Sequence, residues 1–323
     1  MLLTKLQKKL CNILQDGLPL SPDPFDKIAA SLNAAPESVL NEIKSLQNSG
    51  LIRRLAPIIN YRALGFTATL VTAHIPETKI PHVAQAVNSI NNVSHNYLRD
   101  HHYNLWFTLI APSVNQINRT LANLSADCGC TFHSLPALRT FKLNVRFDAD
   151  SNGRSLIQNS AKIPKTNPVK LNETEKLILS KLQAGLKTVP RPFEHLTTNA
   201  LNENDALEVI ESLLNKGVIR RIAAIVDYRA LGFTANALFI AEIPEQKIPD
   251  AGRNLAAIPL VSHCYQRAAF QNFPYNLFAM FHSRSLDQIK DAAAQFTQSQ
   301  NITASALLPT VKELKKVPVK YDF

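Results

Sequence analysis

The sequence has few cysteines, no long apolar run and none of the short motifs that mark common enzyme classes. Its four cysteines in 323 residues show neither disulfide nor zinc spacing, which excludes a disulfide-stabilised secreted domain. No apolar run approaches the roughly 18 residues of a membrane-spanning helix. Residues 1–17 place lysines between leucines instead of forming the apolar core of a secretion signal. A P-loop, a G-x-S-x-G elbow, an H-E-x-x-H motif and a dinucleotide-binding glycine motif are missing. These absences predict a cytoplasmic protein that does not associate with membranes.

Basic residues outnumber acidic ones, but the excess is concentrated in one segment. The net charge is +10, which raises nucleic acid as a possible partner. Residues 151–170 hold four basic and no acidic side chains, together with two prolines. A polar segment that contains proline is typical of a linker. Much of the positive charge is therefore expected to serve solubility.

The chain contains an internal repeat of about 150 residues. NSGLIRRLAPIINYRALGFTA at 48–68 matches NKGVIRRIAAIVDYRALGFTA at 215–235, and VSHNYLR at 93–99 matches VSHCYQR at 261–267. Two fused copies of one unit predict a pseudo-two-fold arrangement, which is an intramolecular version of a homodimer.

Each copy begins with a helical part. In the first copy, amphipathic patterns predict helices over 3–16 and 24–32, and Pro36 and Gly50 mark the ends of a third. The segment 50–59 is then typical of a short β wing. Three helices and a wing predict a winged helix-turn-helix.

The rest of each copy alternates strands and helices in the order βαββαβ, from a strand at 67–75 to a final strand near Thr131. This order is typical of a ferredoxin-like domain. The predicted fold class is therefore α+β, a tandem repeat in which each copy is a winged helix-turn-helix followed by a ferredoxin-like domain. The predicted parts are a winged helix-turn-helix at 1–60, a ferredoxin-like domain at 61–150, a basic linker at 151–170, a second winged helix-turn-helix at 171–227 and a second ferredoxin-like domain at 228–323.

This domain order resembles the Lrp/AsnC transcriptional regulators, and the resemblance implies a DNA-binding regulator with a ligand-binding domain. The third helix argues against DNA, because affinity for DNA comes largely from lysine and arginine on phosphates. Residues 36–49 hold two acidic side chains and one basic one, residues 199–216 hold four and one, and neither segment contains arginine. The arginines lie in the wings, where they could contact phosphate or line a cleft. DNA is therefore not the expected partner.

A row of polar residues appears in both copies at the same register. Alternate residues of a strand share a face, so Val93, His95, Tyr97 and Arg99 are expected to point one way. The second copy repeats the row with Val261, His263, Tyr265 and Arg267. The row could lie in an interface between the copies, with its polar groups bonded across the sheets, or it could hold a polar ligand. Unpaired buried polar groups cost about 1–3 kcal/mol each, which favours the ligand.

The copies diverge directly after this row. The first continues through His101 and His102 to Tyr103, whereas the second runs through AAFQNFP to Tyr275 and has no histidine there. One copy is therefore expected to carry the chemistry while the other binds. Histidine, arginine and aromatic side chains together suit an anionic, planar ligand and a proton transfer.

The combined motifs resemble the siroheme decarboxylases, which have the Lrp/AsnC architecture and occur as two related subunits or as one fused chain. The resemblance rests on G-[LV]-I-R-R and Y-R-A-L-G-F in both copies and on SHNYLRDHHYNLWFT at 94–108. The second copy has Cys264 in place of Asn96 and lacks R-D-H-x. The resemblance implies removal of CO2 from the C12 and C18 acetate side chains of siroheme to give 12,18-didecarboxysiroheme, in heme d1 or alternative heme biosynthesis. It implies no cofactor and no metal beyond the iron of the siroheme substrate.

The resemblance also suggests roles for individual residues. Siroheme carries many carboxylates, which suit arginine, and a histidine with a reference pKa of about 6.5 suits proton delivery. The expected catalytic residues are His95, His101 and His263. The expected substrate-binding residues are Tyr97, Arg99, His102, Tyr103, Tyr265, Arg267, Arg53, Arg54, Arg220, Arg221 and Lys142. A histidine could instead ligate the iron, and which histidine serves which acetate stays open.

The expected partner is siroheme, bound by a pseudo-dimer within one chain that could pair further as a homo-oligomer or with a second decarboxylase chain. The alternative function is an Lrp/AsnC-like regulator or a tetrapyrrole sensor of the same fold, which would bind an operator with a steep salt dependence.

Overall fold

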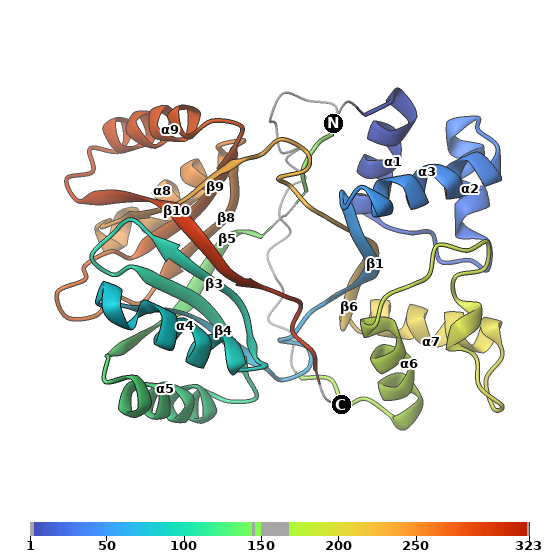
Figure 1. Cartoon of the computed structure of the whole chain (residues 1–323), viewed down its shortest axis with the longest axis horizontal. Coiled ribbons are helices and arrows are strands. Elements are labelled where there is room, and N and C mark those ends of the chain that lie inside the picture. The colour runs from blue at the N-terminus through green and yellow to red at the C-terminus, as the bar shows by residue number, and fades with distance from the viewer. Residues whose placement is uncertain (1–2, 144–145, 150–167, 322) are drawn as a thin grey trace.

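The computed structural model describes residues 3–143, 146–149, 168–321 and 323. It has a helical layer on one side, a large barrel with outer helices on the other, and a two-stranded sheet between them (Figure 1). Residues 151–167 of the predicted linker at 151–170 lie outside the described part of the chain. No helix within the described ranges is both long and apolar enough to cross a membrane.

The helical part of the first half forms as its sequence predicts. Its helices are α1 (Lys5–Asp16), α2 (Pro24–Leu32) and α3 (Pro36–Asn48). Helix α1 begins with a capping box in which Thr4 and Gln7 bond each other's backbone N–H groups. Pro24 and Pro36 occupy the first position of α2 and α3, where a missing N–H costs nothing.

The helical part of the second half has one regular helix fewer. It comprises α6 (Glu173–Gln183), the 3-10 helix η2 (Glu194–Leu196) and α7 (Glu203–Asn215). Pro190 and Pro192 precede η2, and proline interrupts regular helices. Apolar side chains of both helical parts, among them Phe25 and Phe193, join in one core, so the two parts form a single packed layer.

The two wings pair with each other. Strands β1 (Ile52–Ile59) and β6 (Ile219–Val226) form a two-stranded antiparallel sheet. Each wing is therefore one strand that completes its hydrogen bonding with the other half. The sequence predicted the wing at 50–59 but not this pairing, because nothing local encodes a contact over more than 150 residues.

The remaining elements follow the predicted βαββαβ order in both halves. The first half contains β2 (Thr67–Ala73), η1 (Glu77–Lys79), α4 (Ile80–Ser89), β3 (Val93–Arg99), β4 (Leu105–Ala111), α5 (Val114–Cys128) and β5 (Phe132–Leu143). The second half contains β7 (Ala235–Ala241), η3 (Glu245–Lys247), α8 (Ile248–Ala257), β8 (Val261–Arg267), β9 (Leu277–Ser283), α9 (Leu286–Ser299) and β10 (Ser305–Lys316).

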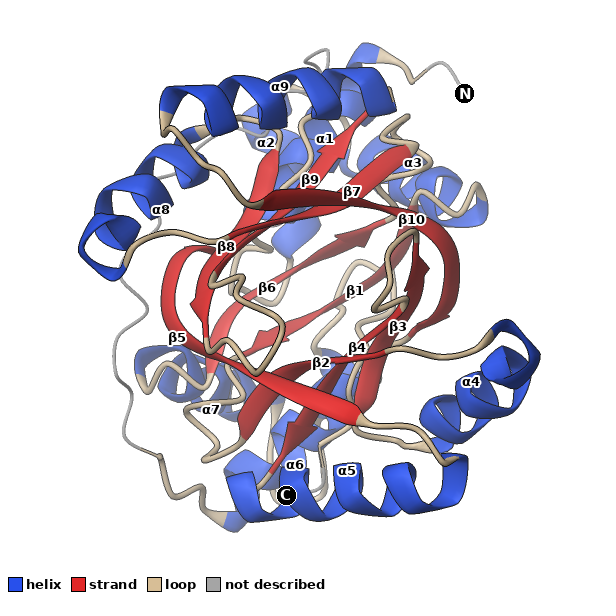
Figure 2. Ribbon diagram, turned by 90° about the vertical axis from the view of Figure 1, so that its left-hand side faces the viewer, coloured by secondary structure: helices blue, strands red, loops and turns tan. Residues whose placement is uncertain are grey.

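The eight strands of these two units close into one barrel, in the order β10-β3-β4-β2-β5-β8-β9-β7 (Figure 2). Closure depends on the last strand of each half, which pairs with its own half and then with the other. Strand β5 pairs with β2 over residues 132–136 and with β8 over 137–143, and β10 does the same with β7 and β3. Helices α4, α5, α8 and α9 cover the outside (Figure 2). The sheet faces that carry no helices therefore face each other across the barrel interior.

Candidate active site

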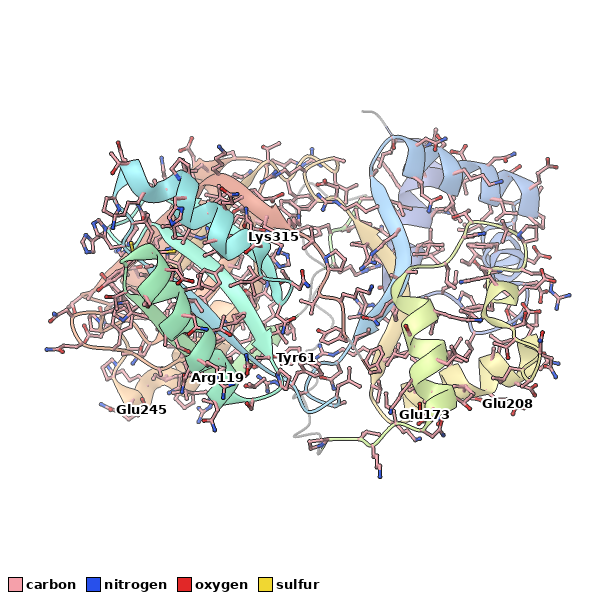
Figure 3. The ribbon with its side chains drawn as sticks, turned by 60° about the horizontal axis from the view of Figure 1, so that its bottom comes forward. Tyr61, Arg119, Glu173, Glu208, Glu245 and Lys315 are labelled. Carbon is pink, nitrogen blue, oxygen red and sulfur yellow. The ribbon has the colours of Figure 1, made fainter. Side chains whose placement is uncertain are left out.

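A cavity of about 510 Å³ lies inside the barrel, lined by strands of both halves. Arg220, Ile225 and Val226 of β6 also line it, so the wing sheet closes the cavity on the side of the helical layer. Tyr61 lines it where the chain passes from β1 toward the barrel (Figure 3). The volume lies in the range of pockets that enclose small-molecule ligands.

The repeated polar row lines this cavity, with one correction. His95, Tyr97 and Arg99 of β3 line it together with Ser94, whereas Val93 packs in the apolar core on the outer side of the sheet. A bulge between residues 93 and 95 explains the difference, because it places an extra residue opposite β4 and breaks the alternation of faces. The second half is alike: His263, Tyr265 and Arg267 line the cavity and Val261 packs in the outer core.

The two cavity histidines are half-buried, and both are neutral at neutral pH. His95 Nδ1 lies 2.8 Å from Ser94 Oγ, and His263 Nδ1 lies 2.9 Å from Ser262 Oγ. Burial, helped by Lys316 and Arg53, lowers the pKa of His95 to about 4. Burial also lowers the pKa of His263 to about 4, with His95 as the next contribution. A carboxylate placed beside either ring would offset these effects and raise its pKa.

A third histidine joins this group, and the sequence reasoning missed it. His282 of β9 is buried, and its Nδ1 lies 3.0 Å from the same Ser262 Oγ that contacts His263. Burial, and then the nearby His263, hold the pKa of His282 well below its usual value. The equivalent residue in the first half is Ile110, which also lines the cavity. A comparison of the two copies at this position could have identified His282, because the first copy has isoleucine there.

Two buried arginines bring positive charge to the cavity. The guanidinium carbon of Arg99 lies 5.2 Å from the ring centre of Tyr97, and that of Arg267 lies 4.7 Å from the ring of Tyr265. Burial lowers the pKa of both arginines to about 10, so both remain charged at neutral pH. The Nε of each is buried with no hydrogen-bond partner among the described residues. A buried cation with an unused donor is stabilised when an anion binds beside it.

Of the four wing arginines expected at the site, only Arg220 lines the cavity. Arg53 instead forms an ion pair of 2.6 Å with Asp227. Arg54 donates to a backbone carbonyl at the end of α6, and Arg221 does not line the cavity. Arg54 and Arg221 differ from Arg220 because neighbouring residues of one strand point to opposite faces, whereas Arg53 is held by its ion pair with Asp227.

Lys142 also lies away from the cavity. Its Nζ lies 3.4 Å from the Ile258 carbonyl oxygen at the end of α8, on the outer side of the barrel. A bulge in β5 between residues 140 and 142 leaves Thr140 and Leu143 on the cavity wall instead. Cavity-lining residues that the sequence reasoning left out are Tyr61, Arg62, Tyr228 and Lys316. The repeated Y-R-A-L-G-F motif contains Tyr61, Arg62 and Tyr228, so the repeat could have identified these three residues.

The histidine-rich turn between β3 and β4 does not reach the cavity. His101 accepts a hydrogen bond of 3.0 Å from the Tyr103 backbone N–H and packs edge-on against Phe273. His102 is exposed and stacks on His74 with ring centres 4.2 Å apart. Tyr103 packs against Phe273 as well. The structure therefore separates His101, His102 and Tyr103 from the cavity wall that holds His95 and His263.

Comparisons with known proteins agree with this arrangement. A model of the AsnC-like ligand binding domain matches residues 63–142 and 230–315. A model of the siroheme decarboxylase NirDL-like HTH domain matches residues 7–53. The first model covers the barrel-forming part of each half, and the second covers the three helices of the first half.

Individual relatives cover most of the chain or one half of it. The siroheme decarboxylase of Hydrogenobacter thermophilus is 35% identical over 316 residues, which is 97% of this chain and 94% of that protein. The siroheme decarboxylase alpha subunit of Desulfovibrio desulfuricans is 36% identical over 46% of this chain and 85% of the subunit.

A solved relative extends the likeness to the whole fold. The crystal structure of the siroheme decarboxylase NirDL in complex with an iron-uroporphyrin III analogue matches with a TM-score of 0.75 and 32% identity. The match covers 99% of this chain and 95% of that one. Because relatives of more than 30% identity span both halves, this chain belongs to the siroheme decarboxylase family.

Proposed function

We propose that this protein removes CO2 from the C12 and C18 acetate side chains of siroheme to give 12,18-didecarboxysiroheme, in heme d1 or alternative heme biosynthesis. The observation that carries the proposal is the barrel cavity, in which histidines and arginines of both halves converge. Family membership supplies the substrate class. Eight-carboxylate tetrapyrroles need several cations, and four arginines line the cavity, Arg62, Arg99, Arg220 and Arg267.

The chemistry has two requirements that this wall meets. When the bond between an acetate methylene and its carboxyl carbon breaks, CO2 leaves and the electron pair stays on the methylene carbon, where the conjugated macrocycle delocalises it. A proton must then reach that carbon. His95 and His263 serve as proton donors, because a bound carboxylate raises their pKa toward neutrality and charges them only when substrate is present.

The aromatic residues orient the reacting groups. Tyr97 and Tyr265 lie beside the histidines of their own strands, with ring centres 6.2 and 6.3 Å apart. Burial raises the pKa of Tyr265 to about 12 and that of Tyr97 further, so both hydroxyls stay protonated and can donate hydrogen bonds. His101, His102 and Tyr103 have no place in this mechanism. The proposal adds no cofactor or metal beyond the iron of the substrate.

We also propose that each half is a winged helix-turn-helix followed by a ferredoxin-like domain, with the parts at 1–60, 61–150, 171–227 and 228–323. The strand orders β3-β4-β2-β5 and β8-β9-β7-β10 support the second part of this layout. The single barrel supports a pseudo-dimer within one chain. The acidic third helices support a role for the helical layer other than binding DNA.

The test is anaerobic incubation of the purified protein with siroheme, followed by mass analysis of the tetrapyrrole. Loss of two CO2 units is the expected result. Loss of one unit would indicate one competent acetate position. Tight binding with no change in mass would overturn the catalytic proposal and leave a sensor.

A further inference from the structure

We infer that the two pseudo-equivalent ends of the cavity differ in how they bind the carboxylates of the ligand, and that the end formed by Arg62, Arg220 and Arg267 binds most of them. The inference rests on the proposed function for the class of ligand, an anionic tetrapyrrole. It concerns which arginines hold most of the carboxylates and which contacts limit the second set of arginines.

The two-fold repeat provides two sets of arginines around the cavity. Arg62, Arg220 and Arg267 form the set called here the open end. Their equivalents by repeat alignment are Arg229, Arg53 and Arg99, called here the paired end. If the halves were equivalent, both sets would offer the same charge to a ligand.

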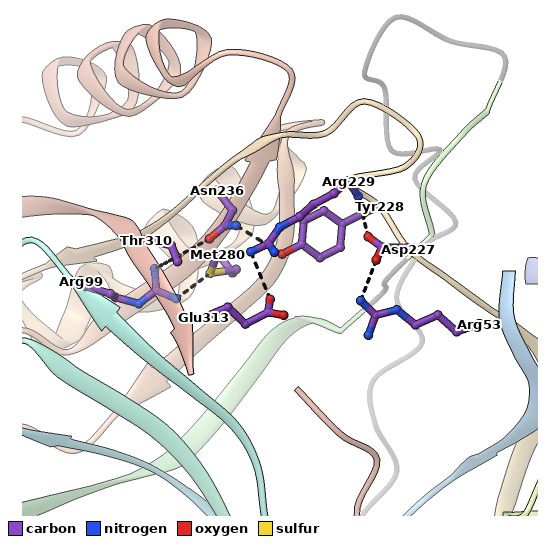
Figure 4. A network of polar contacts seen from close by, with 9 residues as sticks. All are labelled: Arg53, Arg99, Asp227, Tyr228, Arg229, Asn236, Met280, Thr310 and Glu313. Atoms are coloured by element: carbon purple, nitrogen blue, oxygen red, sulfur yellow. Dashed lines mark hydrogen bonds and ion pairs between the residues drawn. The ribbon is translucent and has the colours of Figure 1, made fainter. Parts of the chain in front are cut away.

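Acidic residues pair with two of the three arginines of the paired end, where Lys316 also lines the cavity. Asp227 forms an ion pair of 2.6 Å with Arg53, and Glu313 forms one of 3.1 Å with Arg229 (Figure 4). The Arg53 guanidinium holds the pKa of Asp227 below its usual value, so this carboxylate is charged at neutral pH. Neither Arg53 nor Arg229 lines the cavity.

Hydrogen bonds occupy Nη1 of the remaining arginine of the paired end, Arg99, whose Nε has no partner among the described residues. Arg99 Nη1 donates to Thr310 Oγ1 at 2.9 Å, and Thr310 in turn bonds to the Asn236 side chain (Figure 4). Asn236 also bonds to the Tyr228 hydroxyl at 3.3 Å. The hydrogen-bond network therefore runs from Arg99 through Thr310 and Asn236 to Tyr228.

The open end lacks every one of these polar partners. By repeat alignment the residues equivalent to Asp227, Glu313 and Thr310 are Asn60, Thr140 and Ala137. Strand pairing places Ala68 at the position of Asn236, because Ala68 pairs with Ile110 as Asn236 pairs with His282. Three of them, Ala68, Ala137 and Thr140, line the cavity, whereas Asn236, Thr310 and Glu313 do not. Smaller side chains therefore leave space at this end where the paired end is filled.

The arginines of the open end consequently face the cavity without a carboxylate. Arg62 and Arg220 line it and form no ion pair within the described residues. Arg267 donates to the Leu135 carbonyl at 2.6 Å and has an unused, buried Nε. Burial raises the pKa of Tyr265, and the nearby charges of Arg267, Arg62 and Arg220 oppose that rise. Partly buried like charges repel, and bidentate carboxylates are the anions whose geometry best matches guanidinium groups.

The test uses iron-uroporphyrin III, a tetrapyrrole with eight carboxylates, as the probe and measures its Kd with the full chain. Arg62→Gln is expected to raise the Kd at least about tenfold, because a hydrogen bond to a charged group is lost. Its matched control, Arg229→Gln, changes the equivalent residue of the paired end and is expected to change the Kd less than about threefold. Thermal melts confirm that both variants are folded.

A second variant copies the paired end into the open one. Thr140→Glu places a carboxylate where Glu313 stands in the other half, and it is expected to weaken probe binding at least about tenfold. Thr140→Gln is its uncharged control and is expected to bind more tightly than Thr140→Glu. Equal losses from Arg62→Gln and Arg229→Gln, or unchanged binding by Thr140→Glu, would overturn the inference.

Decarboxylation of siroheme is measured separately, so the two proposals can fail independently. The expected binding pattern without CO2 release would overturn the proposed function and support the inference. CO2 release with equal losses at the two ends, or with no probe binding by the unchanged protein, would overturn the inference alone.

Discussion

The two ends of the cavity are built from equivalent positions of a duplicated unit, yet they differ in charge and in space. Both keep the histidine, tyrosine and arginine of the repeated row. The paired end has Asp227 and Glu313, whereas Ala68, Ala137 and Thr140 line the wall of the open end. The comparison teaches that a fused repeat can keep its reactive groups in both copies while the residues around them change. One copy can then bind while the other serves a different role.

Substitution of the cavity histidines His95 and His263 is expected to cause the largest loss of activity. His95→Ala is expected to lower the rate of siroheme decarboxylation by about 10²–10⁴, because a positioned proton donor contributes that much. His263→Ala tests the equivalent residue of the second half. Mass analysis of the tetrapyrrole after anaerobic single-turnover reactions measures both.

His133→Ala is the control for these two variants. His133 stacks on Phe270 with ring centres 4.0 Å apart and does not line the cavity, so near-normal turnover is expected. Unchanged turnover in His95→Ala would remove His95 from the mechanism. Equal losses in all three variants would point to a general structural effect.

Acid should destabilise the protein through the same histidines. Their pKa is about 4 in the folded chain and about 6.5 in an unfolded one, so the unfolded state takes up protons first. The free energy of unfolding is therefore at its full value above pH 6.5. It falls as the pH drops toward 4, by up to about 3 kcal/mol for each histidine.

Urea unfolding at pH 7.5 and pH 4.5 measures this loss. A His95→Gln/His263→Gln double variant should lose less stability between the two pH values than the unchanged protein, because the titrating groups are gone. An identical loss in both proteins would show that other groups, such as His282, determine the acid sensitivity.

The two buried arginines should respond differently to the same substitution. Arg99 donates to the Leu308 carbonyl and to Thr310, whereas Arg267 donates to the Leu135 carbonyl alone. Arg267→Gln is therefore expected to weaken iron-uroporphyrin binding about 10- to 100-fold, from a loss of about 1.5–3 kcal/mol. Arg99→Gln should weaken binding less and lower the melting temperature more. The reverse order would contradict the assignment of the open end.

The smallest expected effect concerns the packing of β5 on α8. A side chain at Gly252 would meet the ring of Phe141, which belongs to the other half. The residues equivalent to Gly252 and Phe141 by repeat alignment are Ala84 and Leu314. Gly252→Ala is expected to cost about 1–3 kcal/mol of stability by overpacking, and Ala84→Gly about 1 kcal/mol from helix propensity alone. Chemical denaturation compares them, and a stabilised Gly252→Ala would show that Phe141 moves freely.

Local patterns in the sequence predicted most of the elements and part of the site. Helix α2 lies at the predicted 24–32 and strand β3 at 93–99, because proline starts, apolar periodicity and alternation are local signals. Strand alternation also placed His95, Tyr97 and Arg99 on one face. The two bulges that moved Val93 and Lys142 to the outer side have no such signal, since they depend on the partner strand.

The remaining features of the fold and of the site depend on contacts between the halves, which local sequence patterns do not encode. Pairing of β1 with β6, and of β5 and β10 with the opposite half, joins residues far apart in the chain. The pairing of β1 with β6 decides that Arg220 faces the cavity and that Arg53 meets Asp227. A position-by-position comparison of the two copies would have marked Ile110 and His282 as different. It would not have shown at which end of the cavity each of them lies.

A crystal structure of this protein with iron-uroporphyrin III bound would test the central claim most directly. The account predicts one tetrapyrrole in the barrel, with carboxylates in hydrogen-bond contact with Arg62, Arg220 and Arg267 and with the Asp227 and Glu313 ion pairs intact. Carboxylates bound by Arg53 or Arg229, or a ligand outside the barrel, would contradict it.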